Sequence, residues 1–363
     1  MRARLAAVVA FVPLCALSVR PALASPPPRL VHTPVEPKAL EGTLEAFARR
    51  WAAAQPGPAW LGYEVPASGQ HSMCCFDSVD EARHEVGAGG CRIEEHRSFS
   101  MRDGSERLSS LDEETAVVLL RADNGRIGRI RVLSRGCGID AGGRTLTWLE
   151  GVRPAESLGL LASLVGGGGD EDGHDSVGDT AMMAIAVHAA PEADGVLERF
   201  VATSQPVRVR KQAAFWMGQM RGRRGYEVLS RLVREDPSDE VREHGVFALS
   251  QSPVPEAVDA MIRVAREDAS THVRGQALFW LGQKAGGKAV SAISRAIEDD
   301  TDTEVKKKAV FALSQLPKED GVPLLIQVAR TNHDREVRKQ AMFWLGQSGD
   351  SRALAFFEEV LGR

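Results

Sequence analysis

The sequence predicts an all-α solenoid in its C-terminal half, preceded by a small α+β domain with disulfide bonds. Three observations predict this arrangement. An eleven-residue motif recurs every 32 residues between Val209 and Val337. Two runs of strand-forming residues flank an Asn-Gly turn signal at Asn124, as in a hairpin. An even number of cysteines lies in the N-terminal half, namely Cys74, Cys75, Cys91 and Cys137.

The chain begins with the features of a secretory signal peptide. Residues 1–24 combine a basic start, an apolar run at 5–17 and an Ala-Leu-Ala site before Ser25. Leu14 precedes Cys15 where a lipoprotein needs a small residue, and no later segment is long and apolar enough to span a membrane. We therefore expect an exported protein without an integral membrane segment, in the periplasm of a Gram-negative bacterium or, alternatively, secreted.

The next segments are expected to form a tether and then the α+β domain at 39–164. Residues 25–38 are rich in proline, which favours an extended tether. A helix is predicted at about 39–54, where apolar residues recur at helical spacing. These residues are Leu40, Leu44, Phe47 and Trp51.

The rest of the α+β domain is predicted from strand and turn signals. "AWLGYEVP" at 59–66 favours a strand, and 115–134 favours a hairpin because Asn-Gly tolerates positive φ. A further strand is expected within 142–152. Pro154 favours the start of a closing helix that reaches about residue 165.

The four cysteines that follow the signal peptide favour two disulfide bonds, because exported proteins keep paired cysteines oxidised. A bond between the neighbours Cys74 and Cys75 would strain the backbone. We therefore expect each of them to pair with Cys91 or Cys137. A zinc site is the alternative, but the cysteines lack CxxC spacing. Its histidine ligands would be His71, His84 or His96. No metal or cofactor is predicted.

A Gly/Asp-rich linker at 165–176 is expected to separate the two halves as a flexible hinge. The acidic residues in "GGGGDEDGHD" could attract a cation, but they lack the ordered ligand spacing of an EF-hand loop.

The repeated motif predicts six units of 32 residues at 177–363. The first copy is degenerate, and the starting residues are Val177, Val209, Val241, Val273, Val305 and Val337. At 100° per residue, Ala213 and Met217 share one helical face with Val209, which predicts an amphipathic helix, helix A. N-cap residues stand three positions before four of the valines: Ser238, Ser270, Asp302 and Asp334.

A second periodic run follows each copy, as at 257–265, and predicts helix B. Two such helices cannot bury their apolar faces alone, so neighbouring units must stack into a solenoid. The repeats resemble HEAT repeats, in particular the short type of phycobilisome-lyase-like proteins, over 177–363. The whole layout resembles bacterial exported HEAT-repeat-domain proteins. This resemblance implies a HEAT-like α-α superhelix.

Seven residues after each valine, small and large side chains alternate. The series is Ala184, Trp216, Ala248, Trp280, Ala312 and Trp344. Two residues later, glycine and serine alternate in step from Gly218 to Gly346. Because close packing penalises voids and crowding, we expect each Trp to fill space left by the Ala of the adjoining unit.

Phenylalanine recurs six residues after each of the five valines from Val209 onward, nearly opposite the centre of the core face. HEAT-like repeats usually carry a polar residue there, often Glu or Arg. The rings are either buried sideways between neighbouring helices or form a Phe/Gln ladder that binds a protein partner. The ladder consists of Phe215, Phe247, Phe279, Phe311 and Phe343 with Gln219, Gln251, Gln283, Gln315 and Gln347.

A basic residue follows each of the five valines from Val209 onward. The series is Arg210, Arg242, Arg274, Lys306 and Arg338. These charges predict a solvated face or an inter-repeat ladder with the acidic turns, and recognition of an acidic partner is the alternative.

The composition and motifs favour a binding protein over an enzyme. Forty-five basic and 49 acidic residues leave no electrostatic footprint for a nucleic acid. No GxSxG, HExxH, phosphate-binding or dinucleotide-binding motif is present, so no catalytic residue is assigned. We therefore expect a non-catalytic scaffold with an unidentified protein partner. The alternatives are a lyase or enzyme-maturation factor, by analogy with phycobilisome lyases, and a thiol or redox sensor that uses the N-terminal cysteines.

Overall fold

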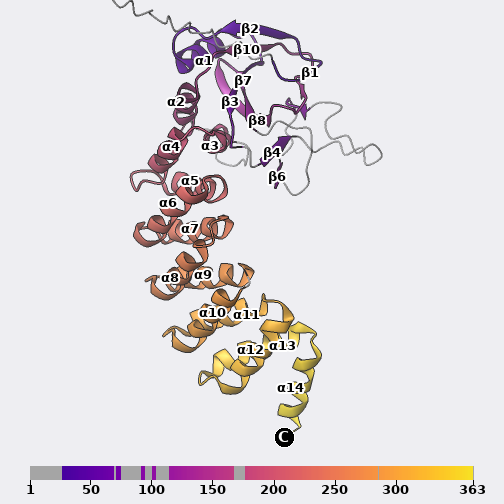
Figure 1. Ribbon diagram of the computed structural model, residues 1–363, viewed down its shortest axis with the longest axis vertical. Coiled ribbons are helices and arrows are strands. Elements are labelled where there is room, and N and C mark those ends of the chain that lie inside the picture. Colours follow the sequence, from indigo (N-terminus) through magenta and orange to yellow (C-terminus); the bar gives the residue numbers. More distant parts are fainter. Residues whose placement is uncertain are drawn as a thin grey trace, which may run out of the picture.

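The computed structural model describes residues 27–68, 71–74, 91–94, 100–103, 114–166, 176–284 and 286–362. A β-rich domain lies at one end, and helices stacked in pairs extend from it as a bent rod (Figure 1). The predicted signal peptide at 1–24 lies outside the described residues.

The centre of the N-terminal domain is a five-stranded sheet in the order β2-β10-β3-β7-β8. Its strands are β2 (Val35–Ala39), β3 (Ala59–Pro66), β7 (Thr115–Asp123), β8 (Arg126–Ser134) and β10 (Leu146–Glu150). β7 and β8 form the predicted hairpin, with Asn124 at φ 51° and Gly125 at φ 77° in its two-residue turn. Both positive φ angles are those that the Asn-Gly pair adopts at low cost.

The two faces of this sheet are covered differently. Leu61, Tyr63 and Val65 of β3 pack toward helices α1 (Leu44–Ala53) and α2 (Pro154–Leu164). Trp60 and Trp148 face a second hydrophobic cluster on the other side, which also contains Cys91 and Cys137. Three short strands, β1 (Leu30–Val31), β9 (Ile139–Asp140) and β5 (Cys91–Arg92), make a sheet there, and β4 (His71–Cys74) pairs with β6 (Ser100–Asp103).

Two predicted boundaries at the start of the domain were wrong. The expected tether at 25–38 contains strand β1 and most of β2, and β2 pairs in parallel with β10 along its whole length. Pro37 is tolerated because β2 is an edge strand with one neighbour. The first helix starts at Leu44 instead of about 39, because Gly42 turns the chain at φ 77° and Thr43 caps the helix.

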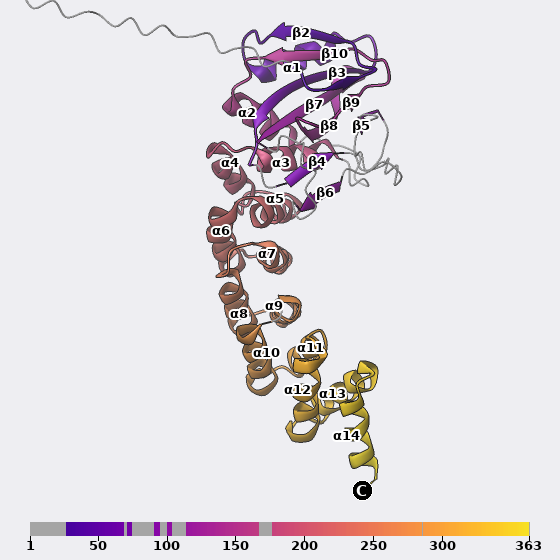
Figure 2. The same ribbon diagram turned by 45° about the vertical axis from the view of Figure 1, so that its right-hand side comes forward.

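Six helix pairs follow at the predicted 32-residue spacing. They are α3 (Val177–Val187) and α4 (Glu192–Phe200), α5 (Val207–Met220) and α6 (Gly222–Glu235), α7 (Asp239–Gln251) and α8 (Ala257–Glu267), α9 (Thr271–Lys284) and α10 (Gly287–Asp299), α11 (Thr303–Ser314) and α12 (Lys318–Thr331), and α13 (Arg335–Ser348) and α14 (Ser351–Leu361). The odd-numbered A helices lie along the inner side of the bend (Figure 2). Valines 209, 241, 273, 305 and 337 are all buried in one interior row, which confirms the solenoid.

Two kinds of contact alternate between successive A helices. A Cβ atom on Gly218 would overlap the backbone of Ala248, and one on Gly282 would lie 2.8 Å from the carbonyl oxygen of Ala312. Helices α5 and α7, and likewise α9 and α11, therefore touch through bare backbone. At the intervening junctions a Trp ring fills the space, as Trp280 of α9 does against Phe247 of α7 at 5.0 Å.

The contacts behind the alternation involve glycine and phenylalanine as well as the expected Trp and Ala. Each internal alanine lies against the glycine of the preceding repeat, as Ala248 does against Gly218. Each Trp of α9 and α13 contacts the phenylalanine of the preceding repeat instead. The structural unit of the stack is therefore a double repeat.

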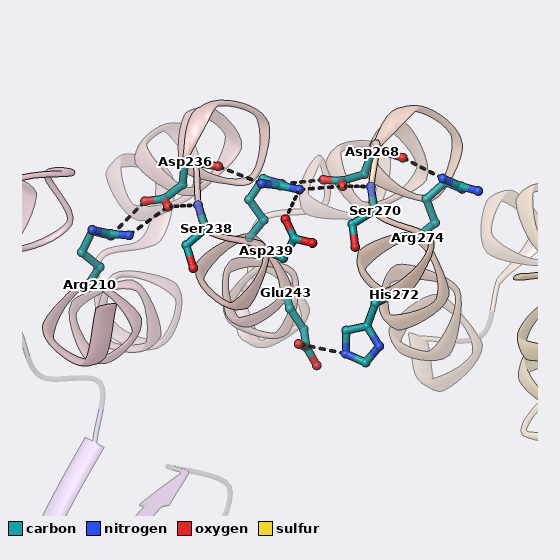
Figure 3. Close-up of polar contacts among 10 residues, drawn as sticks. Arg210, Asp236, Ser238, Asp239, Glu243, Asp268, Ser270, His272 and Arg274 are labelled. Carbon is teal, nitrogen blue, oxygen red and sulfur yellow. Dashed lines mark hydrogen bonds and ion pairs between the residues drawn. The ribbon is translucent and has the colours of Figure 1, made fainter. Parts of the chain in front are cut away.

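The recurring basic residues form the predicted inter-repeat ladder (Figure 3). Nε of Arg242 donates to Asp268 at 2.8 Å, and Nε of Arg274 donates to Asp300 at 2.9 Å. Arg210 forms an ion pair with Asp236 at 3.0 Å, and its Nη2 donates to the same carboxylate at 3.2 Å. Each aspartate also accepts the backbone amide two residues later, so one carboxylate joins two repeats and fixes the turn between them.

The ladder changes at its last step. Lys306 takes the place of arginine, and Asn332 takes the place of aspartate. The ammonium of Lys306 donates to the carbonyl of Glu298, while Arg338 donates to the carbonyl of Asn332 at 2.7 Å. Both members of the ion pair are thus replaced together.

The N-terminal domain and the first repeat share one hydrophobic cluster, which runs from α1 to α14. A chain of buried hydrogen bonds crosses their junction. Tyr63 contacts Ser157 at 3.0 Å, Ser157 contacts Nε2 of His188 at 3.0 Å, and Nδ1 of His188 contacts the carbonyl of Ala184 at 2.7 Å. Residues 167–175 of the expected hinge lie outside the described residues, but the packing on either side holds the two halves together.

The buried position of His188 predicts a pH-dependent stability. Burial lowers the pKa of His188 from 6.5 to about 4, so the unfolded chain binds more protons between these values. The contribution of His188 to the free energy of unfolding is therefore present above pH 6.5 and is lost as the pH falls toward 4. His188 alone should contribute about 2 kcal/mol to the loss between pH 7 and pH 5. Urea unfolding at both pH values should show this loss in the wild type and in His333→Gln, an exposed control. An unchanged pH dependence in His188→Gln would contradict the assignment.

The glycine positions predict opposite effects for one substitution. Gly218→Ala should lower the free energy of unfolding by about 1–3 kcal/mol, because its methyl group overlaps the backbone of α7. Gly346→Ala, at the same repeat position, meets open space and should raise it by about 0.5–1 kcal/mol through helix propensity. Denaturant unfolding measures both, and two changes of the same sign would contradict the close backbone contact at Gly218.

Candidate interaction surface

An unbroken line of aromatic rings runs along the A helices. The rings follow one another in the order Trp216, Phe215, Phe247, Trp280, Phe279, Phe311, Trp344 and Phe343. Neighbouring centroids are 4.9 to 6.0 Å apart. We call this line the aromatic spine. It arises because every motif places Phe at the same helical position and every second motif adds a Trp beside it.

The spine alternates between two ring contacts. At the glycine junctions the Phe rings stack face to face, 5.9 Å and 16° apart for Phe215 and Phe247 and 6.0 Å and 7° apart for Phe279 and Phe311. At the other junctions a Trp inclines against the preceding Phe at about 40°. Ring contacts of this kind stabilise beyond the burial of area.

The spine is partly exposed along its length. Four of its Phe side chains are half-buried, and Phe343 is 54% exposed. The three Trp side chains are also half-buried. The rings therefore contribute exposed apolar surface to one strip along the A helices, which lie on the inner side of the bend (Figure 2).

Amide side chains accompany the rings. A glutamine lies four residues after each Phe and hence on the same side of the helix. Gln283, Gln315 and Gln347 are exposed, whereas Gln219 and Gln251 are half-buried. Nε2 of Gln283 lies 3.5 Å from Oε1 of Gln315, so the amides of neighbouring repeats are within reach of one another. The strip thus combines apolar ring edges with groups that donate and accept hydrogen bonds.

The spine begins in a pocket at the junction with the N-terminal domain. The pocket has a volume of about 760 Å³ and is bounded by β8, α3, α5 and α7. Phe215, Trp216 and Met183 supply apolar surface, and His244 lies at one side. Sequence reasoning missed this pocket, because it depends on β8 packing beside the first repeats.

The charged groups around the pocket are largely paired. Arg208 contacts Asp179 at 3.0 Å, and Gln212 donates to the same carboxylate at 2.7 Å. Lys211 lies 3.7 Å from Glu240. Burial, aided by Lys211, lowers the pKa of His244 to about 4, so the imidazole is neutral at pH 7. The pocket therefore offers apolar surface and hydrogen bonds more than net charge.

The remaining candidate residues lie elsewhere. Cys91 and Cys137 are buried behind the sheet, each 2% exposed. Cys75, His84 and His96, with the side chains of His71 and Cys74, fall outside the described residues. Among the described residues, no three His, Cys, Asp or Glu side chains gather as metal ligands do. No described helix is both long and apolar enough to cross a bilayer.

Comparison with known proteins identifies the repeats. The HEAT-repeat family matches residues 193–282, 258–345 and 290–363. Among solved structures, human deoxyhypusine hydroxylase in complex with glycerol is 14% identical, with 57% of this chain and 90% of that chain covered and a TM-score of 0.25. The complex of CpcE and CpcF of phycocyanin lyase from Nostoc sp. PCC7120 is 18% identical, with 57% and 81% covered and a TM-score of 0.31.

YibA of Escherichia coli is 16% identical, with 57% of this chain and 76% of that chain covered and a TM-score of 0.34. These values carry no argument about function. No curated protein matches the sequence. The family match, the 32-residue period and the stacked helix pairs agree: residues 193–363 of this chain belong to the HEAT-repeat family.

Proposed function

We propose that this protein is an exported, non-catalytic scaffold that binds a protein partner along the aromatic spine. The observation that supports this most is the partial exposure of the whole spine. A side chain needed only to hold helices together can be fully buried, as the interior valines are. Aromatic side chains at a surface contribute large contact areas with little loss of conformational entropy on binding.

The glutamines supply the polar half of the proposed surface. Their amides can donate to and accept from the backbone of a bound segment, which fixes its position beside the rings. The pocket at Phe215 and Trp216 is wide enough to take a large side chain of that partner. The paired charges around it favour an apolar group there over a charged one.

Export and disulfide formation are part of the same proposal. The N-terminal sequence favours secretion, and the burial of Cys91 and Cys137 in one apolar cluster supports structural disulfides rather than reactive thiols. We expect Cys74 and Cys75 to be their partners. Such bonds would stabilise a domain with a small second core.

Photo-crosslinking tests the binding surface. A photoreactive residue at Gln283 or Gln315, beside the spine, should give covalent adducts with a protein partner in the native cell envelope. The same residue at Arg295 or Gln327 serves as the matched control, since both are exposed and their helices, α10 and α12, lie on the outer side of the bend (Figure 2). Adducts that form equally at all four positions, or only at the control positions, would contradict the proposal.

Thiol counting tests the disulfides. The mature protein, unfolded in guanidinium without reductant, should show no free thiol, and after reduction it should show all four. Two or more free thiols before reduction would contradict structural disulfides and favour a thiol sensor. Mass spectrometry of the same sample gives the mature N-terminus, which should follow Ala24.

A further inference from the structure

The outer face of helix α13 repeats a surface that is covered elsewhere in the molecule. Helices α5, α9 and α13 carry the same motif, with Phe followed by Trp and then, two residues later, by glycine. In α5 and α9 this Phe and glycine contact the next A helix. In α13, Phe343 is 54% exposed, and a Cβ atom on Gly346 would meet nothing within 4 Å.

Apolar exposure concentrates in the last helix pair. Among the described residues, four of the five large exposed hydrophobic side chains belong to α13 and α14. They are Phe343, Leu354, Val360 and Leu361. Apolar groups gathered in this way at one end of a rod indicate an interaction site more than scattered surface residues do.

The equivalent faces of α5 and α9 are each covered by a helix of this chain, and the two covering helices share the same residue types. The helix that packs on α5 presents Phe247 followed by Ala248, and the helix that packs on α9 presents Phe311 followed by Ala312. In each case the ring stacks on the Phe of the preceding helix, and the small alanine lets the backbones meet at the glycine. Each covering helix also carries a glutamate seven residues before its Phe, Glu240 in α7 and Glu304 in α11.

The first of these glutamates has a charged neighbour across the junction. Glu240 lies 3.7 Å from Lys211 of α5. The equivalent residue of α13 is Lys339, an exposed side chain that contacts Glu336 of its own helix at 2.8 Å. A second carboxylate can therefore approach this ammonium from the uncovered side.

We propose that the outer face of α13 is a docking site for an amphipathic helix of another protein, one that presents a Phe followed by a small residue. The ring stacks on Phe343, the small residue lies on Gly346, and an acidic residue two turns earlier approaches Lys339. This site goes beyond the proposed function of the spine, because it takes a single helix packed side by side on α13 at the end of the rod. It shares only Phe343 with the spine.

The probe is a peptide of residues 301–316, which contains the α11 sequence. Isolated helices of this length are marginal in water, so a lactam between Lys306 and the substitution Val310→Glu holds it helical. At 100° per residue these two positions lie opposite the face that carries Phe311 and Ala312. Fluorescence anisotropy of the labelled peptide, titrated with the full-length protein, measures binding.

Saturable binding of the peptide is expected for the wild type. Gly346→Leu should weaken this binding at least ten-fold, because the leucine side chain occupies the space beside Cα of residue 346 where the small residue of the peptide would lie. Gly195→Leu is the matched control, since this exposed helical glycine in α4 also has open space around it and should bind as the wild type does. A peptide with Phe311→Ser should not bind. Thermal unfolding checks that both variants fold.

Three results would overturn the proposal. They are the absence of saturable binding by the helical peptide, equal binding to the wild type and Gly346→Leu, and equal binding of the Phe311→Ser peptide. Sedimentation of the protein alone supplies a fourth. If the wild type forms a dimer that Gly346→Leu does not form, α13 of a second copy covers this face. That result would contradict the proposal, because α13 has Trp344 after its Phe where the proposed occupant has a small residue.

Discussion

Close packing between successive A helices is the constraint on which the rest of the solenoid depends. The gap between two stacked helices must be filled, and this chain fills it in two ways. At one type of junction, Gly218 and Gly282 bring backbones into contact. At the other, Trp280 and Trp344 act as spacers. The positions of the rings and amides on the inner face follow from this alternation.

The Arg–Asp ladder complements this packing at the turns. Asp236 and Asp268 are nearly inaccessible to water, and each is satisfied by an arginine of the preceding repeat and by a backbone amide of its own turn. A buried carboxylate with such partners fixes geometry, because losing either partner leaves a charge without compensation. The packing determines how close neighbouring helices lie, and the ladder determines how each repeat is rotated onto the next.

The solenoid and the hairpin could be predicted from sequence because local signals determine them. Val209 and its equivalents recur at one spacing, and Asn124-Gly125 has the chemistry of a tight turn. Strand β2 and the junction around His188 could not be predicted from sequence, because both depend on partners distant in the chain. Pro37 disfavours a strand locally, yet β10 provides a neighbour for it. The candidate Phe residues were found by their period, but their continuity with the Trp rings needed the distances between helices.

The shared hydrophobic cluster that joins the sheet to the first repeat makes the two ends of the rod unequal. Helix α3 is flanked by α2 and β8, so opening it exposes apolar surface of the folded N-terminal domain as well as its own. Helix α14 contacts only α12 and α13 among the elements with substantial packing. In a linear stack, local unfolding therefore costs least at α14 and progressively more toward the sheet. Helix α14 is therefore expected to unfold locally and refold more often than the helices next to the sheet.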